Sequence, residues 1–514
     1  MTGTLLPLVI SVLHERLHFR YWTLPRVVRL DTFFIDLSDW KLAFSDRTPC
    51  FWVHTPELLG QPVVNLADEI RDAVRQKGWQ KETILVLVEG PADELRGRLS
   101  TSFTQFLVLG EQQHKEIASA PSPTRVMLDL LLPQMPRARL GPYQTTRPVT
   151  GSRFFGRESY LNKMIAHRNQ NYVIIGIRRI GKTSLLQEVK RRLDLVDEPN
   201  PEQQRRLYID CSVITSAEEL YREIVLRLRK EELKRLLGRN TESLRFQAQM
   251  FEYLAGQNGG TITYLLDEID GLLKHLGGDL SVFDVLRRVS SEDGAARFII
   301  AGFREARRAV SDDKTPFYNF GEPLVLDAMD RTEVKRMVEF PMDQLRVKLQ
   351  GRDEILQRIY RETAGMPNFV QYYCQTLLEN LDRSSQDTLS VAHLQSVYEN
   401  RNFRDFVIKT FIRNTVPLER AIVFAMVAKN HTRNAESYSQ KDIDDELSRR
   451  GVNLGFTELD EGCGNLVAAG ILQQHGRQYS FSIPLFARML EENFSVDFVL
   501  KKTRDELIAK KVIA

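Results

Sequence analysis

The stretch that decides the fold is Gly176-Ile177-Arg178-Arg179-Ile180-Gly181-Lys182-Thr183. It fits the pattern G-x-x-x-x-G-K-[ST], it follows the apolar run Tyr172 to Ile175, and apolar residues at helical spacing come after it. The glycines let the backbone turn so that its N–H groups converge on phosphate oxygens, and a helix that begins near Lys182 adds its positive N-terminal end. The stretch therefore predicts a phosphate-binding loop between a strand and a helix.

Each residue type in this loop has its own expected role. Gly176 and Gly181 shape the backbone, and Lys182 is expected to contact the β and γ phosphates of a nucleotide as a point charge. Thr183 offers a hydroxyl to a Mg²⁺ ion that bridges the same phosphates. We interpret the two arginines between the glycines as solvated charges of the loop.

A second motif, Asp267-Glu268-Ile269-Asp270, follows the apolar run Ile262 to Leu266. Carboxylates at the C-terminal end of a strand lie where open α/β sheets bind ligands. Asp267 is expected to support the Mg²⁺ ion, and Glu268 is expected to polarise the attacking water and accept its proton. The chain has no N-K-x-D motif for reading guanine, so ATP is the expected nucleotide.

The elements around these motifs indicate the architecture. Strand and helix patterns alternate from Arg153 to about Ala328, which is typical of a parallel sheet covered on both faces. A strand at Leu207 to Asp210 comes between the two motif strands along the chain and implies that they are not neighbours in the sheet. A helix from Arg331 to Phe340 is expected to end at Pro341. Further on, three helical patterns and a hairpin fit a winged helix.

The predicted fold class is therefore α/β, a P-loop NTPase sheet with a helical lid, a C-terminal winged helix and a small N-terminal α/β domain. The predicted units are a small α/β domain with a sensor, interaction or effector role at 1–140, a linker at 141–152, a P-loop ATPase domain at 153–328, a helical lid at 329–410, a winged-helix domain at 411–495 and a C-terminal helix or tail at 496–514.

Composition excludes several classes of protein. The 514 residues hold 71 Lys and Arg against 68 Asp and Glu, a net charge of +3 that lacks the global basic footprint of a dedicated nucleic-acid binder. The four cysteines lie far apart, which speaks against a disulfide framework and a zinc site. No apolar run approaches the ~20 residues that span a bilayer. We expect a cytoplasmic protein without membrane contact.

Together the motifs resemble the STAND branch of AAA+ related ATPases. The resemblance rests on the phosphate loop with Ser184-Leu185-Leu186 after it, on Leu265-Leu266-Asp267-Glu268, on Phe154-Phe155-Gly156-Arg157-Glu158 and on Thr363-Ala364-Gly365-Met366-Pro367. It implies a nucleotide site that includes Ser184, with Phe155, Gly156 and Arg157 bordering the adenine and Pro367 closing over it.

The same resemblance implies a role for Arg304, the first basic residue after the strand Arg297 to Ala301. Many STAND proteins end this strand in an arginine that contacts the γ-phosphate, so Arg304 is a candidate for catalysis. The alternative is a solvated charge in the basic run that it begins. A polar sensor that AAA+ proteins usually place here is absent from Gly302 and Phe303, so hydrolysis is expected to be slow.

These inferences predict a regulatory switch that binds ATP and ADP with Mg²⁺, hydrolyses ATP slowly, and forms homo-oligomers or binds a partner protein in signalling or defence. The alternative is a DNA-loading or DNA-remodelling AAA+ ATPase. The helix expected to enter a DNA groove, Thr457 to Ala469, carries Glu458, Asp460 and Glu461 and no Lys or Arg. Because phosphates repel such a surface, we favour internal packing or protein contact for the winged helix.

Overall fold

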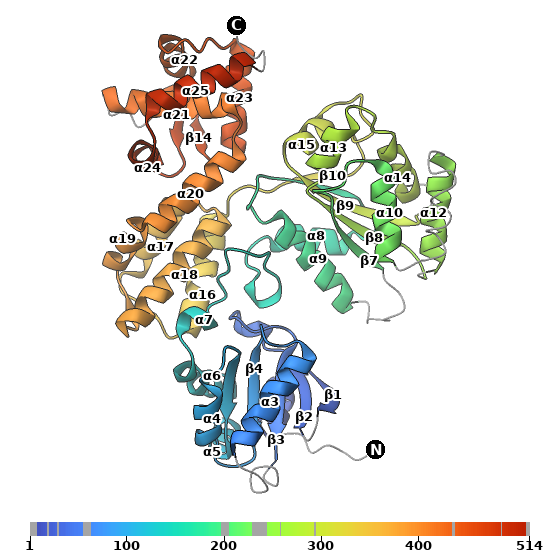
Figure 1. The fold of residues 1–514 in the computed structure, drawn as a ribbon, viewed down its shortest axis with the longest axis vertical. Helices are drawn as coiled ribbons and strands as arrows, with labels where there is room; N and C mark the ends of the chain where they lie inside the picture. Colours follow the sequence, from blue (N-terminus) through green and yellow to red (C-terminus); the bar gives the residue numbers. More distant parts are fainter. Residues whose placement is uncertain are drawn as a thin grey trace.

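The computed structural model describes residues 8–17, 20–27, 30–54, 63–196, 205–228, 244–257, 259–291, 294–433, 437–484 and 486–509. The N-terminal α/β unit lies at one end of the molecule, and the C-terminal helical unit lies at the other. The sheet that carries the phosphate loop lies to one side of the helices that join these units (Figure 1). The last five residues of the predicted tail, 510–514, lie outside the described residues.

The central sheet is entirely parallel, with the strand order β10-β6-β9-β8-β7. Its strands are β6 (Tyr172–Ile175), β7 (Arg206–Asp210), β8 (Ile262–Asp267), β9 (Ala296–Gly302) and β10 (Glu322–Val325). This confirms the predicted P-loop NTPase sheet. The strands before the two motifs, β6 and β8, are not neighbours, as predicted. The strand between them in the sheet is β9, and β7 lies at the edge.

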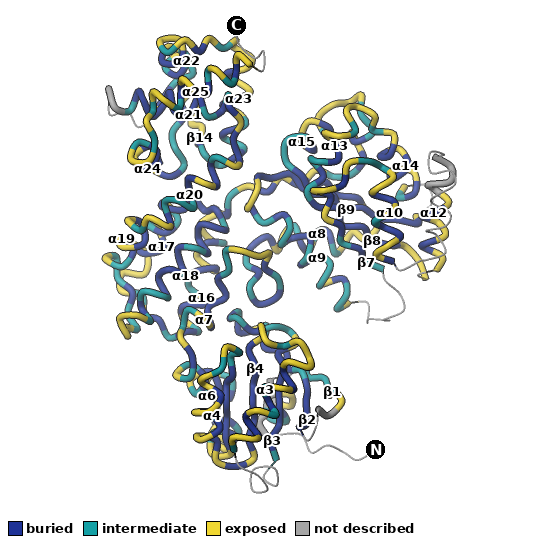
Figure 2. Tube along the Cα trace, in the orientation of Figure 1, coloured by how far each residue is buried: buried dark blue, intermediate teal, exposed yellow. Residues whose placement is uncertain are grey.

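Helices cover both faces of this sheet because the strands are apolar on both. In β6 the side chains of Tyr172 and Ile174 join one buried cluster, and those of Val173 and Ile175 join another. The first cluster includes residues of α8 (Glu158–Ala166) and α9 (Lys182–Val196). The second includes residues of α10 (Ala217–Arg227), α12 (Leu244–Gln257), α13 (Asp270–Leu276), α14 (Ser281–Ser291) and α15 (Arg304–Ser311). Every residue of β6, β8 and β9 is buried, whereas the edge strands β7 and β10 have exposed residues. Figure 2 shows the buried interior of this sheet.

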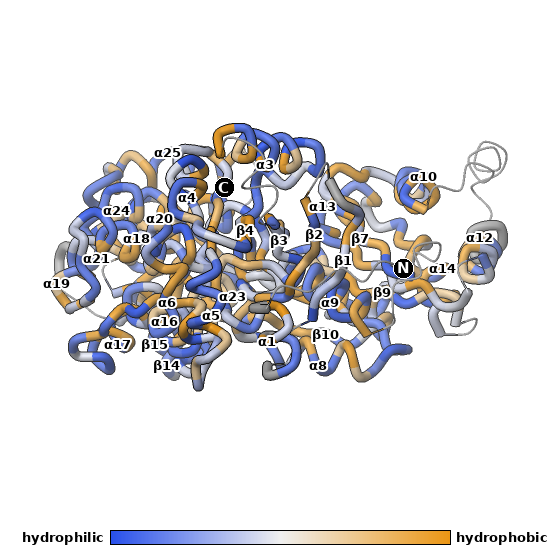
Figure 3. Tube along the Cα trace, turned by 90° about the horizontal axis from the view of Figure 1, so that it is seen from below, coloured by the Kyte–Doolittle hydropathy of each residue, from blue (hydrophilic) through white to orange (hydrophobic). Residues whose placement is uncertain are grey.

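The N-terminal unit is a five-stranded mixed sheet in the order β1-β2-β3-β4-β5, in which β3, β4 and β5 are parallel and the first three strands are antiparallel. Its strands are β1 (Tyr21–Val27), β2 (Leu30–Ile35), β3 (Thr48–Val53), β4 (Thr83–Val88) and β5 (Gln105–Leu109). Its helices are α1 (Leu8–Leu17), α3 (Val63–Lys77), α4 (Asp93–Leu99), α5 (Glu111–Ser119), α6 (Pro123–Leu131) and α7 (Arg137–Leu140). The outer helices of the molecule carry both hydrophilic and hydrophobic residues (Figure 3), as expected for helices with one buried face.

The helical lid consists of α16 (Arg331–Gln344), α17 (Arg352–Thr363), α18 (Pro367–Ser384), α19 (Val391–Tyr398) and α20 (Arg401–Asn414). The region is not helical throughout, because β11 (Lys348–Leu349) pairs with β12 (Thr388–Leu389). One hydrophobic cluster runs from the N-terminal unit through the lid to the C-terminal unit and contains Leu140, Leu185, Met337 and Phe424.

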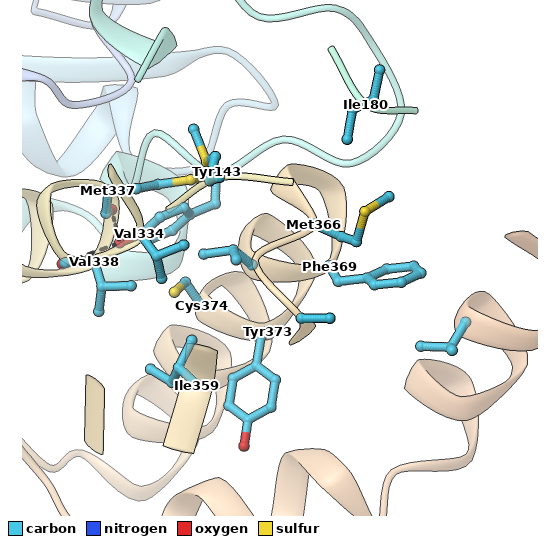
Figure 4. Close-up of a cluster of buried hydrophobic side chains, with 14 of the residues drawn as sticks. Tyr143, Ile180, Val334, Met337, Val338, Ile359, Met366, Phe369, Tyr373 and Cys374 are labelled. Atoms are coloured by element: carbon cyan, nitrogen blue, oxygen red, sulfur yellow. Dashed lines mark hydrogen bonds between the residues drawn. The ribbon is translucent and has the colours of Figure 1, made fainter. Parts of the chain in front are cut away.

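The prediction that the first lid helix ends at Pro341 is wrong, because α16 continues to Gln344. A proline inside a helix removes the hydrogen bond to the carbonyl four residues earlier, which here belongs to Met337. The Tyr143 hydroxyl donates to this Met337 carbonyl over 3.1 Å and so replaces the missing donor. Figure 4 shows Tyr143 beside Met337 and Val338. The helix therefore continues beyond Pro341 with its free carbonyl paired to a residue almost two hundred positions away in the sequence.

The C-terminal unit has the helices and hairpin expected of a winged helix. It consists of α21 (Pro417–Arg433), β13 (Tyr438–Ser439), α22 (Gln440–Arg449), α23 (Phe456–Ala468), β14 (Leu472–His475), β15 (Gln478–Phe481), α24 (Phe486–Asn493) and α25 (Val496–Ala509). The strands pair in the order β13-β15-β14. Among the helices in the described ranges, none combines the length and the apolar character that crossing a membrane requires.

Candidate functional site

The loop Gly176 to Gly181 joins β6 to α9 and is fixed by apolar anchors. The side chains of Ile177 and Ile180 are buried, whereas Arg178 and Arg179 lie at the surface between them. A Cβ at Gly176 would lie 2.9 Å from the Ile180 side chain and 3.2 Å from the Leu326 carbonyl, so only glycine fits there. Gly181 has room for a Cβ, but its φ of +107° is a backbone conformation that residues with side chains rarely adopt.

Lys182, the first residue of α9, is buried inside the loop. Only 4% of its surface is exposed, and its Nζ donates to the carbonyls of Gly176 at 2.7 Å and Ile177 at 3.0 Å. Burial lowers the pKa of Lys182, while the nearby carboxylates of Glu268 and Asp267 act in the opposite direction. The loop thus surrounds a cation in a position where an anion would be attracted.

Asp267 ends β8 and joins the two motifs through hydrogen bonds. Its Oδ2 accepts from the Thr183 hydroxyl at 2.6 Å and from the Tyr208 hydroxyl at 2.9 Å, and only 1% of the residue is exposed. Its Oδ1 accepts from the backbone N–H of Glu268 at 2.9 Å. Thr183 and Asp267 are thus held together at the C-terminal edge of the sheet. A hydroxyl beside a carboxylate is an oxygen set that suits Mg²⁺.

A cavity of about 690 Å³ lies against this loop. One side, which we call the loop wall, consists of residues 178–184 and Glu268. The opposite side, which we call the lid wall, consists of Met329, Met337, Pro367, Asn368, Gln371, Tyr372, Phe406, Thr410, Arg413 and Asn414. Residues 144–149, Arg153, Phe154, Phe155 and Arg157 complete the lining. The segment predicted as a linker therefore forms part of the cavity.

The predicted adenine segment lies at this cavity, although not all of its residues face it. Phe155, Arg157 and Pro367 line the cavity, whereas Gly156 does not. Gly156 has φ +68°, and a Cβ there would lie 2.7 Å from Met329 Cε. Gly156 therefore lets the chain pass close to the lid. The Arg157 guanidinium donates to the Asp327 carbonyl.

Arg304 is the residue that the resemblance predicts as a contact of the γ-phosphate. It does not line the cavity, and it forms a two-pronged ion pair with Glu419 of α21 over 2.5 and 2.6 Å. The Glu419 side chain is fully buried, and Arg304 also donates to the Asn414 carbonyl at 2.7 Å. Neither sequence interpretation anticipated this partner, because Glu419 lies over a hundred residues away. Arg304 joins the central sheet domain to the C-terminal unit.

The residues that sequence reasoning missed lie at the end of α20. Asn414 Oδ1 accepts from the Arg178 backbone N–H at 3.0 Å, and Thr410 Oγ1 accepts from the Arg179 side chain at 3.1 Å. The Arg179 guanidinium also lies 4.6 Å from the centre of the Phe406 ring. Arg179 is exposed, as expected of a loop charge, and it also contacts the lid, which was not expected. No local motif marks α20, so the sequence offered no signal for this contact.

Four predicted residues therefore line the cavity at the loop: Gly181, Lys182, Thr183 and Ser184. Ser184 Oγ accepts from the Val149 backbone N–H at 3.1 Å and so ties the loop to the 144–149 segment. Glu268 also lines the cavity and has φ +51°, a strained conformation for a residue other than glycine. Gly176 and Asp267 lie behind the lining and position it.

The chain was compared with curated proteins, with solved structures and with models of protein families. No curated protein sequence matches the chain. Among solved structures, a Walker-type ATPase of Pyrococcus abyssi is similar at 17% identity over 67% of this chain and 99% of the other, with a TM-score of 0.49. The ORC2 protein of Aeropyrum pernix, solved as ADPNP–ADP complexes, is similar at 15% identity over 68% of this chain and 92% of the other, with a TM-score of 0.48.

A match to a family model covers the two motifs themselves. Residues 165–310 match the AAA domain model, and this range contains the phosphate loop, β8 with Asp267 and Glu268, and β9. Residues 165–310 are thus similar to the AAA domain, and the central parallel sheet has the fold of a P-loop NTPase.

Proposed function

We propose that the chain binds ATP with Mg²⁺ at this cavity, hydrolyses it slowly, and acts as a switch of the STAND type. The observation that carries the proposal is the placement of Lys182 and Thr183 on one wall of a cavity whose other wall is the lid, with Asp267 bonded to Thr183 behind that wall. When bound, Mg²⁺ would neutralise charge on the β and γ phosphates. The residues fit it, because Thr183 supplies a hydroxyl and Asp267 a buried carboxylate beside it.

The hydrolytic role falls to Glu268, the cavity-lining carboxylate on the loop wall. A carboxylate that faces the cavity can orient a water and accept its proton, while Asp267 is occupied by the Thr183 and Tyr208 hydroxyls. The two neighbouring acids thus have different surroundings and, in this proposal, different tasks.

The switch rests on how the units touch each other around the cavity. The N-terminal unit contacts the phosphate-loop domain through Asp46, which pairs with Arg191 of α9 at 2.8 Å. It contacts the lid through the backbone N–H groups of Arg137 and Ala138, which donate to the Asp382 carboxylate at 3.1 and 2.8 Å. A nucleotide that changes the spacing of the two walls would therefore also change how the N-terminal unit is held.

The alternative, a DNA-loading or DNA-remodelling ATPase, has weaker support. In α23 the acidic residue Glu461 lies 3.6 Å from Arg308 of α15, and Gln440 of α22 donates to Asp460 at 2.7 Å. Glu458, Asp460 and Glu461 are exposed, and an acidic face repels phosphates, so the charge of α23 favours protein contact over DNA contact. DNA-stimulated ATP turnover that weakens steeply with salt would favour the alternative. The proposed switch, in contrast, would form homo-oligomers when it binds ATP and would act in signalling or defence.

The test is Lys182→Met, which keeps the volume of the side chain and removes its charge. We expect ATP binding, measured by calorimetry with Mg²⁺ present, to fall at least 100-fold. Because burial already disfavours the ammonium, the free energy of unfolding without nucleotide should change by less than about 1 kcal/mol. Normal ATP affinity in this variant would overturn the proposed site. Lys190→Met, in the same helix, is the control, because Lys190 pairs with Asp194 outside the cavity.

A further inference from the structure

One buried amide of the lid wall is unlike its neighbours. Asn368 is the second residue of α18, only 9% of it is exposed, and it lines the cavity. Neither its Nδ2 nor its Oδ1 has a hydrogen-bond partner in the described part of the chain. Buried polar side chains are nearly always paired, so such an exception calls for a physical reason.

Three other amide side chains line the same cavity, and each has a partner. Gln144 Oε1 accepts from Arg153 at 2.5 Å, and Gln371 Oε1 accepts from the Gln144 backbone N–H at 2.6 Å. Asn414 accepts from the Arg178 backbone and donates to the Thr410 carbonyl. Burial alone therefore does not leave an amide unpaired in this cavity.

From this contrast we infer that Asn368 recognises the nucleoside part of the bound nucleotide by hydrogen bonds to its amide. The inference deepens the proposed function and rests on it. An amide presents a donor and an acceptor side by side. Phosphate oxygens at neutral pH only accept, so a phosphate would leave Oδ1 unpaired. The edge of adenine offers a donor next to an acceptor, and a ribose hydroxyl both donates and accepts.

The surroundings of Asn368 agree with a nucleoside. Pro367 precedes it, and Met329, Met337 and Phe155 supply further apolar surface to the cavity. Apolar side chains with a few placed polar groups are typical of sites for heterocyclic ligands. Lys182 and the two loop arginines belong to the loop wall, whereas Asn368 belongs to the lid wall, which also carries Arg413. The phosphate-loop lysine and the unpaired amide thus lie on different walls of the cavity.

The test is Asn368→Leu, which keeps the approximate shape of the side chain and removes both hydrogen-bonding atoms. We expect ATP affinity in calorimetry to fall about tenfold or more, and the affinity for inorganic tripolyphosphate to stay unchanged. The melting temperature without nucleotide should rise or stay the same, because an unpaired buried amide has been removed. Asn380→Leu is the matched control, because Asn380 lies on the same helix, bonds to Ser396 and does not line the cavity.

Analogues separate the two parts of the nucleoside. ITP replaces the adenine amino group by a carbonyl, and 2′- and 3′-deoxy-ATP each lack one ribose hydroxyl. An analogue that binds the unsubstituted chain more weakly than ATP, but binds Asn368→Leu as tightly as ATP, identifies the group that Asn368 contacts. A contact to the adenine amino group or to a ribose hydroxyl supports the inference. The nucleoside assignment is overturned if every analogue is weaker than ATP by the same factor in Asn368→Leu as in the unsubstituted chain. It is also overturned if Asn368→Leu lowers tripolyphosphate affinity as much as ATP affinity.

Two further outcomes keep this inference apart from the proposed function. If Asn368→Leu binds ATP as tightly as the unsubstituted chain, the role of Asn368 is overturned and the ATP site stands. If the unsubstituted chain binds neither ATP nor tripolyphosphate, the proposed function and the role of Asn368 are overturned together.

Discussion

The two walls of the cavity are built in different ways. The loop wall comes from a continuous stretch, residues 178–184, and from Glu268 directly after a strand. The lid wall gathers residues from α16, α18 and α20 and the turn before α16, segments spread over more than eighty positions. The loop wall carries its chemistry in a local pattern of residue types, whereas the lid wall acquires its chemistry only when distant helices pack together. If the proposed function holds, the loop wall should control binding and turnover and the lid wall should control closure and selectivity.

The largest expected effect belongs to the loop wall and comes from Glu268→Gln. The amide keeps the shape of the side chain and cannot accept a proton, so ATP should still bind while turnover falls about 100- to 10,000-fold. Turnover is measured by phosphate release and binding by calorimetry. Glu305→Gln is the matched control, because Glu305 lies at the start of α15 and does not line the cavity. Unchanged turnover in Glu268→Gln would exclude Glu268 as the base.

The next effect concerns how the C-terminal unit, which follows the lid wall along the chain, is held against the central sheet domain. Glu419→Ala removes the buried carboxylate of the Arg304 pair, whereas the Arg304 side chain is 24% exposed and still donates to the Asn414 carbonyl. The variant should therefore cost about 2–4 kcal/mol of unfolding free energy, less than an unpaired charge that is fully buried. The measurement is denaturant unfolding without nucleotide. The double variant Arg304→Met, Glu419→Leu replaces both charges by apolar groups and should cost much less.

This comparison also tests the role of Arg304. If the pair is only structural, the double variant should keep normal ATP turnover. If Arg304 leaves Glu419 to contact the γ-phosphate, as the family resemblance implies, the double variant should lose turnover while keeping its fold. A single variant that costs less than about 1 kcal/mol would contradict the importance of the pair itself.

The same contrast explains how far the sequence could predict the molecule. The strands β6 to β10 and the places of Lys182 and Asp267 beside them could be predicted from apolar runs and local motifs. The order of helices and hairpin in the C-terminal unit could be predicted from hydrophobic periodicity. The positions of Glu419 and Asn414 could not be predicted, because each acts through a partner more than one hundred residues away. Local spacing carries no information about such partners. Pairing that depends on tertiary packing becomes visible only in the structure.

Pro341 is a clear instance of this limit. A local rule correctly says that proline removes a helix hydrogen bond, and it wrongly ends the helix there. The rule fails because the Tyr143 hydroxyl pairs with the carbonyl that the proline leaves free. Tyr143 lies in the segment that the sequence suggested was only a linker. A tertiary contact thus overrides a reliable local signal.

Tyr143→Phe tests this explanation and has a smaller expected effect. The variant removes only the hydroxyl and leaves the Met337 carbonyl buried and unpaired, so unfolding free energy should fall by about 1–3 kcal/mol. Tyr398→Phe is the matched control in the lid, because the Tyr398 hydroxyl is buried without a partner in the described residues. Its removal should be neutral or stabilising. Equal losses in the two variants would contradict the assigned role of Tyr143.

The smallest expected effect is the pH dependence of ATP binding that comes from Lys182 on the loop wall. Burial lowers the pKa of Lys182 below its usual value of 10.5, so on titration to alkaline pH its ammonium should lose its proton earlier than an exposed lysine. ATP affinity should therefore decline as pH rises from about 8 to 10, by less than tenfold per pH unit.

The sign for stability is the opposite. In the unfolded chain Lys182 binds its proton more tightly than in the folded chain, so deprotonation relieves a cost of folding, and the contribution of Lys182 to stability should rise with pH. Calorimetry of ATP binding and denaturant unfolding without nucleotide, both at pH 8, 9 and 10, measure the two trends. Lys182→Met should abolish the pH dependence that belongs to Lys182 in both measurements. An alkaline loss of affinity that persists in Lys182→Met would assign the titrating group to another residue and contradict this account of the loop wall.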